Sequence, residues 1–111
     1  MEKLTKKESA KLAGQASFIY LFKEIKTNKI IYVGCTRYVG RRLTEHKTSL
    51  LDETNRASIY LYMRENNLQF FRDVEFTIVD YIQDRGQAQI IESQLIDKYK
   101  STVLNTVKYD T

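Results

Sequence analysis

Residues 17–34 read SFIYLFKEIKTNKIIYVG, and this stretch decides the fold. Its first part, Ser17–Glu24, is rich in aromatic and branched aliphatic residues and lacks helical periodicity, which is typical of a strand buried on both faces. A polar turn follows at Lys26–Lys29, and the apolar run Ile30–Gly34 then returns as a second strand. The stretch therefore predicts an antiparallel β-hairpin.

Three segments after the hairpin are expected to be helices: Tyr38–Leu51, Ala57–Glu65 and Arg85–Lys100. The second is expected to stop at Asn66 and Asn67, because asparagine tolerates the left-handed conformation on which helices often end. Asp84 and Gln87 resemble a capping box at the start of the third helix.

The segment Asp73–Tyr81 alternates between apolar and polar residues, which predicts a third strand. Val74, Phe76 and Ile78 are expected on its inner face. A short basic helix is expected before the hairpin, at Lys3–Leu12. The order helix, two strands, two helices, strand, helix indicates an α+β domain built around a small antiparallel sheet.

A chain of 111 residues with 42% hydrophobic residues can bury one core, so residues 1–111 are expected to form a single domain with a basic helical extension at 1–14. The net charge of +4 fits an anionic partner such as nucleic acid, although many ordinary domains share it. Cys35 is the only cysteine, so no intramolecular disulfide is expected. No apolar run approaches the roughly 20 residues that span a bilayer. We therefore expect a cytoplasmic protein that has no membrane partner.

The first long helix places two polar side chains on its inward face. Its apolar stripe consists of Val39, Leu43 and Leu50. Arg42 and His46 fall in the same stripe, because residues three, four and seven positions apart share one face of a helix. His46 is the only histidine, and its position suits either a packed side chain or a catalytic one.

The last helix carries a carboxylate, Glu92, within its apolar stripe. That stripe consists of Ala88, Ile91, Leu95 and Tyr99. A buried charge needs a partner or a water-filled cleft. Two interpretations follow for Glu92: a structural ion pair with Arg42, or a cleft in which Glu92 holds Mg²⁺ or Mn²⁺ while Arg42 holds a phosphate.

Tyr20 and Tyr32, on the two strands of the hairpin, add two phenols to this set. A phenol is a poor base at neutral pH unless a nearby cation lowers its pKa, and strand tyrosines are also common as packing residues. Cys35 and His46 are candidates for a nucleophile and its base, with inert packing of the thiol as the alternative. The sequence has no Walker A loop and no G-x-G-x-x-G, so a nucleotide cofactor is not indicated.

Together these residues resemble the motifs of the GIY-YIG nucleases. Phe18-Ile19-Tyr20 and Tyr32-Val33-Gly34 resemble the two motifs that name the family. The other matching positions are Arg42 for the catalytic arginine, His46 for the helix histidine, Glu92 for the metal-binding glutamate, and Leu104-Asn105 for the leucine-asparagine pair near the domain end. The resemblance covers the chain from about Ser17 to Asn105, with all five motifs in order when Arg42 and His46 are counted as one.

The resemblance implies a three-stranded antiparallel sheet flanked by helices, which cleaves DNA phosphodiester bonds with one divalent metal, Mg²⁺ or Mn²⁺. Under it, Glu92 binds the metal and Arg42 stabilises charge on the phosphate. Tyr20 or Tyr32 activates the attacking water, with His46 assisting proton movement. The remaining roles are those of Asn105, which orients neighbours or substrate, and Gly34, which allows a close approach of backbones.

Phe18 occupies the position of the glycine in the first motif. This departure leaves an alternative function, a catalytically weak or inactive domain that binds nucleic acid or another protein. Arg41 adjoins Arg42, and the helical stripe favours Arg42 as the catalytic residue. Arg37, Arg41 and Lys47 flank the expected cleft and are candidates for contacts with the DNA backbone.

The sequence has no recognisable second domain for reading DNA. We therefore expect little sequence preference, recognition through the domain's own loops, or a targeting partner. Both a monomer and a homodimer fit the sequence. The N-terminal lysines form either a solvated helix face or a set of phosphate contacts; they are Lys3, Lys6, Lys7 and Lys11.

Overall fold

The hairpin predicted from residues 17–34 is present, and its first strand is the centre of the sheet. The computed structural model describes residues 16–105. Its three strands are β1 (Ser17–Glu24), β2 (Lys29–Thr36) and β3 (Val74–Ile82). They form an antiparallel sheet in the order β2-β1-β3. The expected α+β fold with a three-stranded antiparallel sheet is therefore confirmed.

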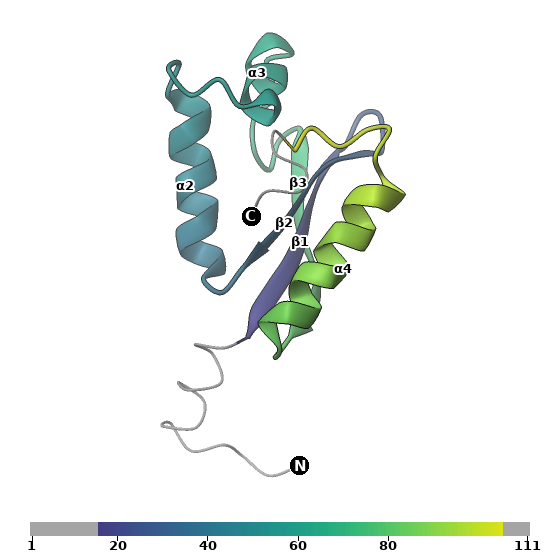
Figure 1. Cartoon of the computed structure of the whole chain (residues 1–111). Helices are drawn as coiled ribbons and strands as arrows, with labels where there is room; N and C mark the ends of the chain where they lie inside the picture. The colour runs from purple at the N-terminus through teal and green to yellow at the C-terminus, as the bar shows by residue number, and fades with distance from the viewer. Residues whose placement is uncertain (1–15, 106–111) are drawn as a thin grey trace.

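Helices lie on both faces of this sheet (Figure 1). Helices α2 (Val39–Leu51) and α3 (Ser58–Glu65) pack on one face, and α4 (Arg85–Lys98) packs on the other. None of the helices within residues 16–105 combines the length and hydrophobicity that a membrane-spanning helix needs. The helix expected at Lys3–Leu12 lies outside the described residues.

The middle strand, β1, contributes to the core on both of its faces. Six of its eight residues are buried, as the sequence predicts for a strand covered on two sides. Tyr20 and Phe22 belong to the cluster under α2 and α3, together with Met63. Leu21 packs on the opposite face with Ile96 of α4. Because side chains alternate along a strand, β1 holds the two helical layers together.

The edge strand β3 is less buried than its sequence alternation predicts. Of the three residues expected on its inner face, Val74 is buried, Phe76 is half-buried and Ile78 is 46% exposed. The pairing register with β1 shifts at Val79, which opposes no residue of β1. The bulge begins after Ile78, which opposes Tyr20 as Phe76 opposes Phe22. Val74, Phe76 and Ile78 therefore share one face of β3 as predicted, although Ile78 at the far end is less covered.

The helix ends follow the capping signals in the sequence. Asn67, just after α3, adopts the left-handed conformation with a φ of 54°. The N–H of Leu68 donates to the carbonyl of Met63 at 2.8 Å, which closes a Schellman-type turn. At the start of α4, the carboxylate of Asp84 accepts a hydrogen bond from the N–H of Gln87 at 3.1 Å.

The segment after α4 lies along the open edge of β2. The N–H of Leu104 donates to the carbonyl of Ile31 at 2.7 Å. The side-chain amide of Asn105 donates to the carbonyl of Val33 at 2.8 Å and accepts from the N–H of Val33 at 3.2 Å. Asn105 therefore satisfies the backbone groups of Val33 that a neighbouring strand would otherwise bind, at the point where β2 reaches the cleft described below.

Replacing Asn105 with Ala should destabilise the fold. Val33 has no exposed surface, so the substitution leaves its N–H and carbonyl without partners. We expect the free energy of unfolding, measured by urea denaturation, to fall by about 1–3 kcal/mol. Asn66→Ala is the control, because its exposed amide bonds only to a helix-end carbonyl. Equal stability of the parent and N105A would contradict a structural role for these bonds.

Candidate active site

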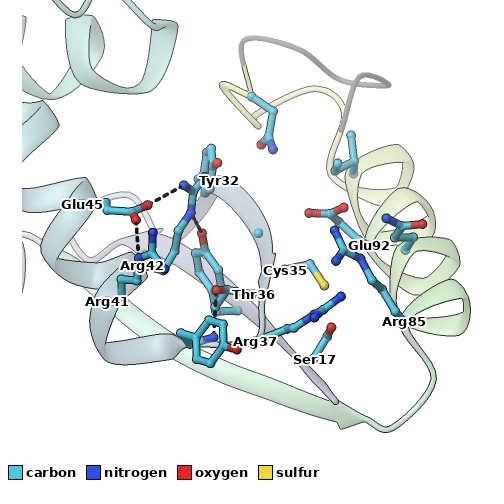
Figure 2. A pocket seen from close by; sticks show the side chains of 16 residues that line it. Ser17, Tyr32, Cys35, Thr36, Arg37, Arg41, Arg42, Glu45, Arg85 and Glu92 are labelled. Atoms are coloured by element: carbon cyan, nitrogen blue, oxygen red, sulfur yellow. Dashed lines mark hydrogen bonds and ion pairs between the residues drawn. The ribbon is translucent and has the colours of Figure 1, made fainter. Parts of the chain in front are cut away.

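A cleft of about 530 Å³ lies where β2, the start of α2 and one face of α4 meet (Figure 2). Seven of the residues predicted to act in catalysis or nucleic-acid binding line it: Tyr20, Tyr32, Arg37, Arg41, Arg42, Glu92 and Asn105. The other lining residues are Ser17, Gly34, Cys35, Thr36, Tyr38, Glu45, Arg85, Gln89 and Ile96. The predicted residues His46 and Lys47 do not line the cleft.

Glu92 reaches the cleft from α4 and is half-buried. The buried residues of α4, Ala88 and Ile96, lie one turn before and one turn after Glu92, so Glu92 is on the packing face of the helix, as the sequence predicts. Burial raises the pKa of Glu92, and the positive charge of Arg42 opposes that rise. Within residues 16–105 no ion pair or hydrogen bond joins Glu92 to Arg42. The interpretation of these two residues as a structural ion pair is therefore wrong.

Arg42 is instead held by two neighbours on its own side of the cleft. Its Nη1 lies 3.0 Å from a carboxylate oxygen of Glu45, and its Nε donates to the hydroxyl of Tyr20 at 3.4 Å. Glu45 also accepts from Nε of Arg41 at 3.2 Å. Burial lowers the pKa of Arg42, but the contacts with Tyr20 and Glu45 outweigh this effect and raise it overall, so the guanidinium stays charged.

The side chain of Tyr20 projects from β1 toward α2 and has no exposed surface. Its hydroxyl is 2.8 Å from Nε2 of His46 and accepts the bond from Arg42. Burial, as the largest cause, raises the pKa of this phenol well above its ordinary value. A Cβ atom on Gly34 would overlap Cζ and the hydroxyl of Tyr20. The expected close approach at Gly34 is therefore made by a side chain and not by backbone.

His46 is 1% exposed and lies beneath the cleft. Its Nδ1 is 2.7 Å from the hydroxyl of Tyr60, and its Nε2 bonds to Tyr20. Burial, assisted by the charge of Arg42, lowers the pKa of His46 to about 4, so the ring is neutral at neutral pH. Both ring nitrogens are bonded to phenols. His46 therefore acts on the cleft only through Tyr20, and it is not paired with the thiol of Cys35.

Two other residues singled out from the sequence lie away from the cleft. The ammonium of Lys47 is 5.0 Å from the centre of the Phe71 ring, so this lysine is not placed to contact a substrate in the cleft. The ring of Phe18 packs on Tyr81, with 4.7 Å between ring centres. Phe18 is absent from the residues with positive φ, so this position does not require the glycine of the family motif.

Arg85 and Gln89 are cleft residues that the sequence interpretation missed. They precede Glu92 by seven and three positions on α4, a spacing that places all three on one helix face. Their spacing from Glu92 is the signal in the sequence that indicates Arg85 and Gln89. Both residues lie in the polar part of the helix, where side chains are ordinarily solvated.

The donors in the cleft fit a hard divalent cation better than a zinc ion. Within residues 16–105 no group of three or more His, Cys, Asp and Glu side chains is placed to hold a metal. Zinc sites in proteins need three or four such ligands. Mg²⁺ keeps several waters and often takes only one or two carboxylates together with substrate phosphates. Glu92 can supply one such carboxylate.

The low pKa of His46 predicts a dependence of stability on pH. The unfolded chain takes up the proton near pH 6.5 and the folded chain only near pH 4, so neutral His46 stabilises the fold fully above pH 6.5, and this stability is lost as the pH falls to about 4. The loss should be about 3 kcal/mol in urea unfolding and should disappear in His46→Gln.

NMR offers an independent check, since His46 is the only histidine. Its Cε1 proton signal should not titrate between about pH 8 and pH 5.5. A midpoint near the ordinary value would show that the ring is not buried as described.

The sequence matches the family model of the GIY-YIG catalytic domain over residues 16–108. No curated protein and no solved structure matches the chain. The matched region includes every strand and helix described above and both walls of the cleft. On this match, the chain belongs to the GIY-YIG nuclease family.

Proposed function

We propose that this protein is a divalent-metal-dependent endonuclease that hydrolyses DNA phosphodiester bonds in this cleft. The observation that carries the proposal is the placement of Glu92 and Arg42 on opposite walls of one open cleft, without a bond between them. A partially buried carboxylate that faces a cation across a cleft is a common arrangement at phosphoryl-transfer sites, where catalysis is mainly positioning and charge stabilisation.

Glu92 would hold Mg²⁺ or Mn²⁺, with water and substrate phosphate as the other ligands. When bound, such an ion acts as a Lewis acid that stabilises charge on the phosphate oxygens. Glu92 is suited to this role because its half-buried carboxylate has no ion-pair partner among the described residues.

Arg42 would bind a phosphate oxygen and stabilise the charge that develops on it. Its guanidinium is already oriented by Tyr20 and Glu45 before any substrate enters. Preorganised donors of this kind are effective because they need little rearrangement during the reaction. Arg41, which shares the carboxylate of Glu45 and is more exposed, would contact the DNA backbone further out.

We assign proton abstraction from water to Tyr32. Its half-buried side chain lines the cleft, and no hydrogen bond occupies its hydroxyl within residues 16–105. Tyr20 has no exposed surface, and its hydroxyl is occupied by His46 and Arg42, so we infer that Tyr20 positions Arg42. Arg42 lines the same cleft as Tyr32, so its guanidinium would offset negative charge that forms there.

Nicking of supercoiled plasmid DNA tests the proposal. With Mg²⁺, Glu92→Gln and Arg42→Ala should each cut roughly 100- to 1,000-fold more slowly than the parent, because each loses one stabilising contact with the transition state. A chelator should abolish cutting by the parent. Glu65→Gln, at the exposed end of α3, is the control. Parental rates in both variants would show that the site is elsewhere, and tight binding without any cutting would favour the inactive nucleic-acid-binding alternative.

The two tyrosines can be separated by removing one hydroxyl at a time. Tyr32→Phe should lower the cutting rate roughly 100-fold and leave the free energy of unfolding unchanged. Tyr20→Phe removes a buried hydrogen-bonded hydroxyl and should also cost about 1–3 kcal/mol of stability. Plasmid nicking and urea unfolding on the same preparations give both quantities. The assignment is reversed if Tyr32→Phe cuts normally while Tyr20→Phe is inactive and fully stable.

A further inference from the structure

The four arginines that line the cleft fall into two groups. Arg41 and Arg42 share the carboxylate of Glu45. Arg37 and Arg85 have no carboxylate partner within residues 16–105. The arginines on the α2 side are therefore ion-paired, whereas those on the side of the β2–α2 loop and α4 make no direct ion pair, and Glu92 is the carboxylate that lines the cleft there.

Arg37 and Arg85 approach each other from different parts of the chain. Arg37 follows β2, and Arg85 is the first residue of α4. Figure 2 shows the side chain of Arg37 extending across the cleft toward α4, where Arg85 and Glu92 lie. Both residues line the same cleft, with the thiol of Cys35 between the strand and the helix.

Packing alone does not account for this pair of cations. The Nε of Arg37 is buried and has no hydrogen-bond partner among the described residues. The cation–π contacts of residues 16–105 involve Lys47 and Lys98, so neither arginine is placed over a ring. Two guanidiniums that line the same cleft repel each other, and an anion bound between them would offset that repulsion.

We propose that Arg37 and Arg85 form a second phosphate-binding subsite, which holds the backbone phosphate next to the one positioned by Arg42 and Glu92. The proposal rests on the proposed nuclease function and adds to it. Guanidinium forks match the oxygens of a phosphodiester in bidentate geometry. The substrate class is then a polynucleotide with at least two consecutive phosphodiesters, and the cleft binds a single diester less well.

DNA binding by the double variant Arg37→Gln/Arg85→Gln tests this subsite. Fluorescence anisotropy with a labelled duplex, in chelator and over a series of salt concentrations, measures affinity without catalysis. The variant should bind roughly tenfold more weakly, and the slope of log K against log salt should fall by about one. The matched control is Arg56→Gln/Lys100→Gln, which removes the same charge from exposed positions outside the cleft.

The length of the ligand gives a second measurement. In NMR titrations, the parent should bind a trinucleotide with two phosphodiesters roughly tenfold more tightly than a dinucleotide with one, and the double variant should lose this difference. Thermal unfolding should show that the variant is about as stable as the parent, because Arg85 is exposed, Arg37 is only half-buried, and neither makes an ion pair within residues 16–105.

The subsite is overturned if the double variant keeps the affinity, the salt slope and the gain from the second phosphate. If the parent protein binds DNA but never cuts it, only the proposed nuclease function is excluded and the subsite stands, because every measurement of the subsite is made without turnover.

Discussion

The hydroxyl of Tyr20 lies 2.8 Å from Nε2 of His46 and 3.4 Å from Nε of Arg42, and its ring covers Gly34. One buried side chain thereby joins β1, β2 and α2. Any larger residue at position 34 displaces the ring, and any shift of the ring moves the guanidinium above it. The wall of the cleft that carries Arg42 depends on this contact, since Glu45 alone holds Arg42 through an exposed ion pair.

The sequence predicts those parts of the fold that depend only on residues within the same short segment. Ser17–Glu24 has the composition of a doubly covered strand, and Asn67 and Asp84 mark helix ends through their own backbone and side-chain chemistry. The bulge at Val79 was not predictable, because it depends on how β3 pairs with β1. The bonds from Asn105 to β2 likewise depend on where the last segment lies in space.

The sequence predicts seven of the residues that line the cleft, but it does not predict how they contact one another. Helical spacing correctly placed Arg42 and His46 on one face of α2, yet one residue lines the cleft and the other is sealed beneath it. Spacing shows which side chains share a face, and it does not show how far a neighbouring sheet covers that face. Lys47, next to His46 in sequence, does not line the cleft, whereas Arg85, seven positions before Glu92 on α4, does.

The hydrogen bonds between Asn105 and Val33 join positions 72 residues apart in the chain. During translation β1, β2 and α2 leave the ribosome first, and the edge of β2 stays open until the segment after α4 has emerged. The second wall of the cleft, which bears Glu92, is also a late product of synthesis. The wall that carries Arg42 can therefore form before the wall that carries Glu92, and the cleft is complete only when both have folded.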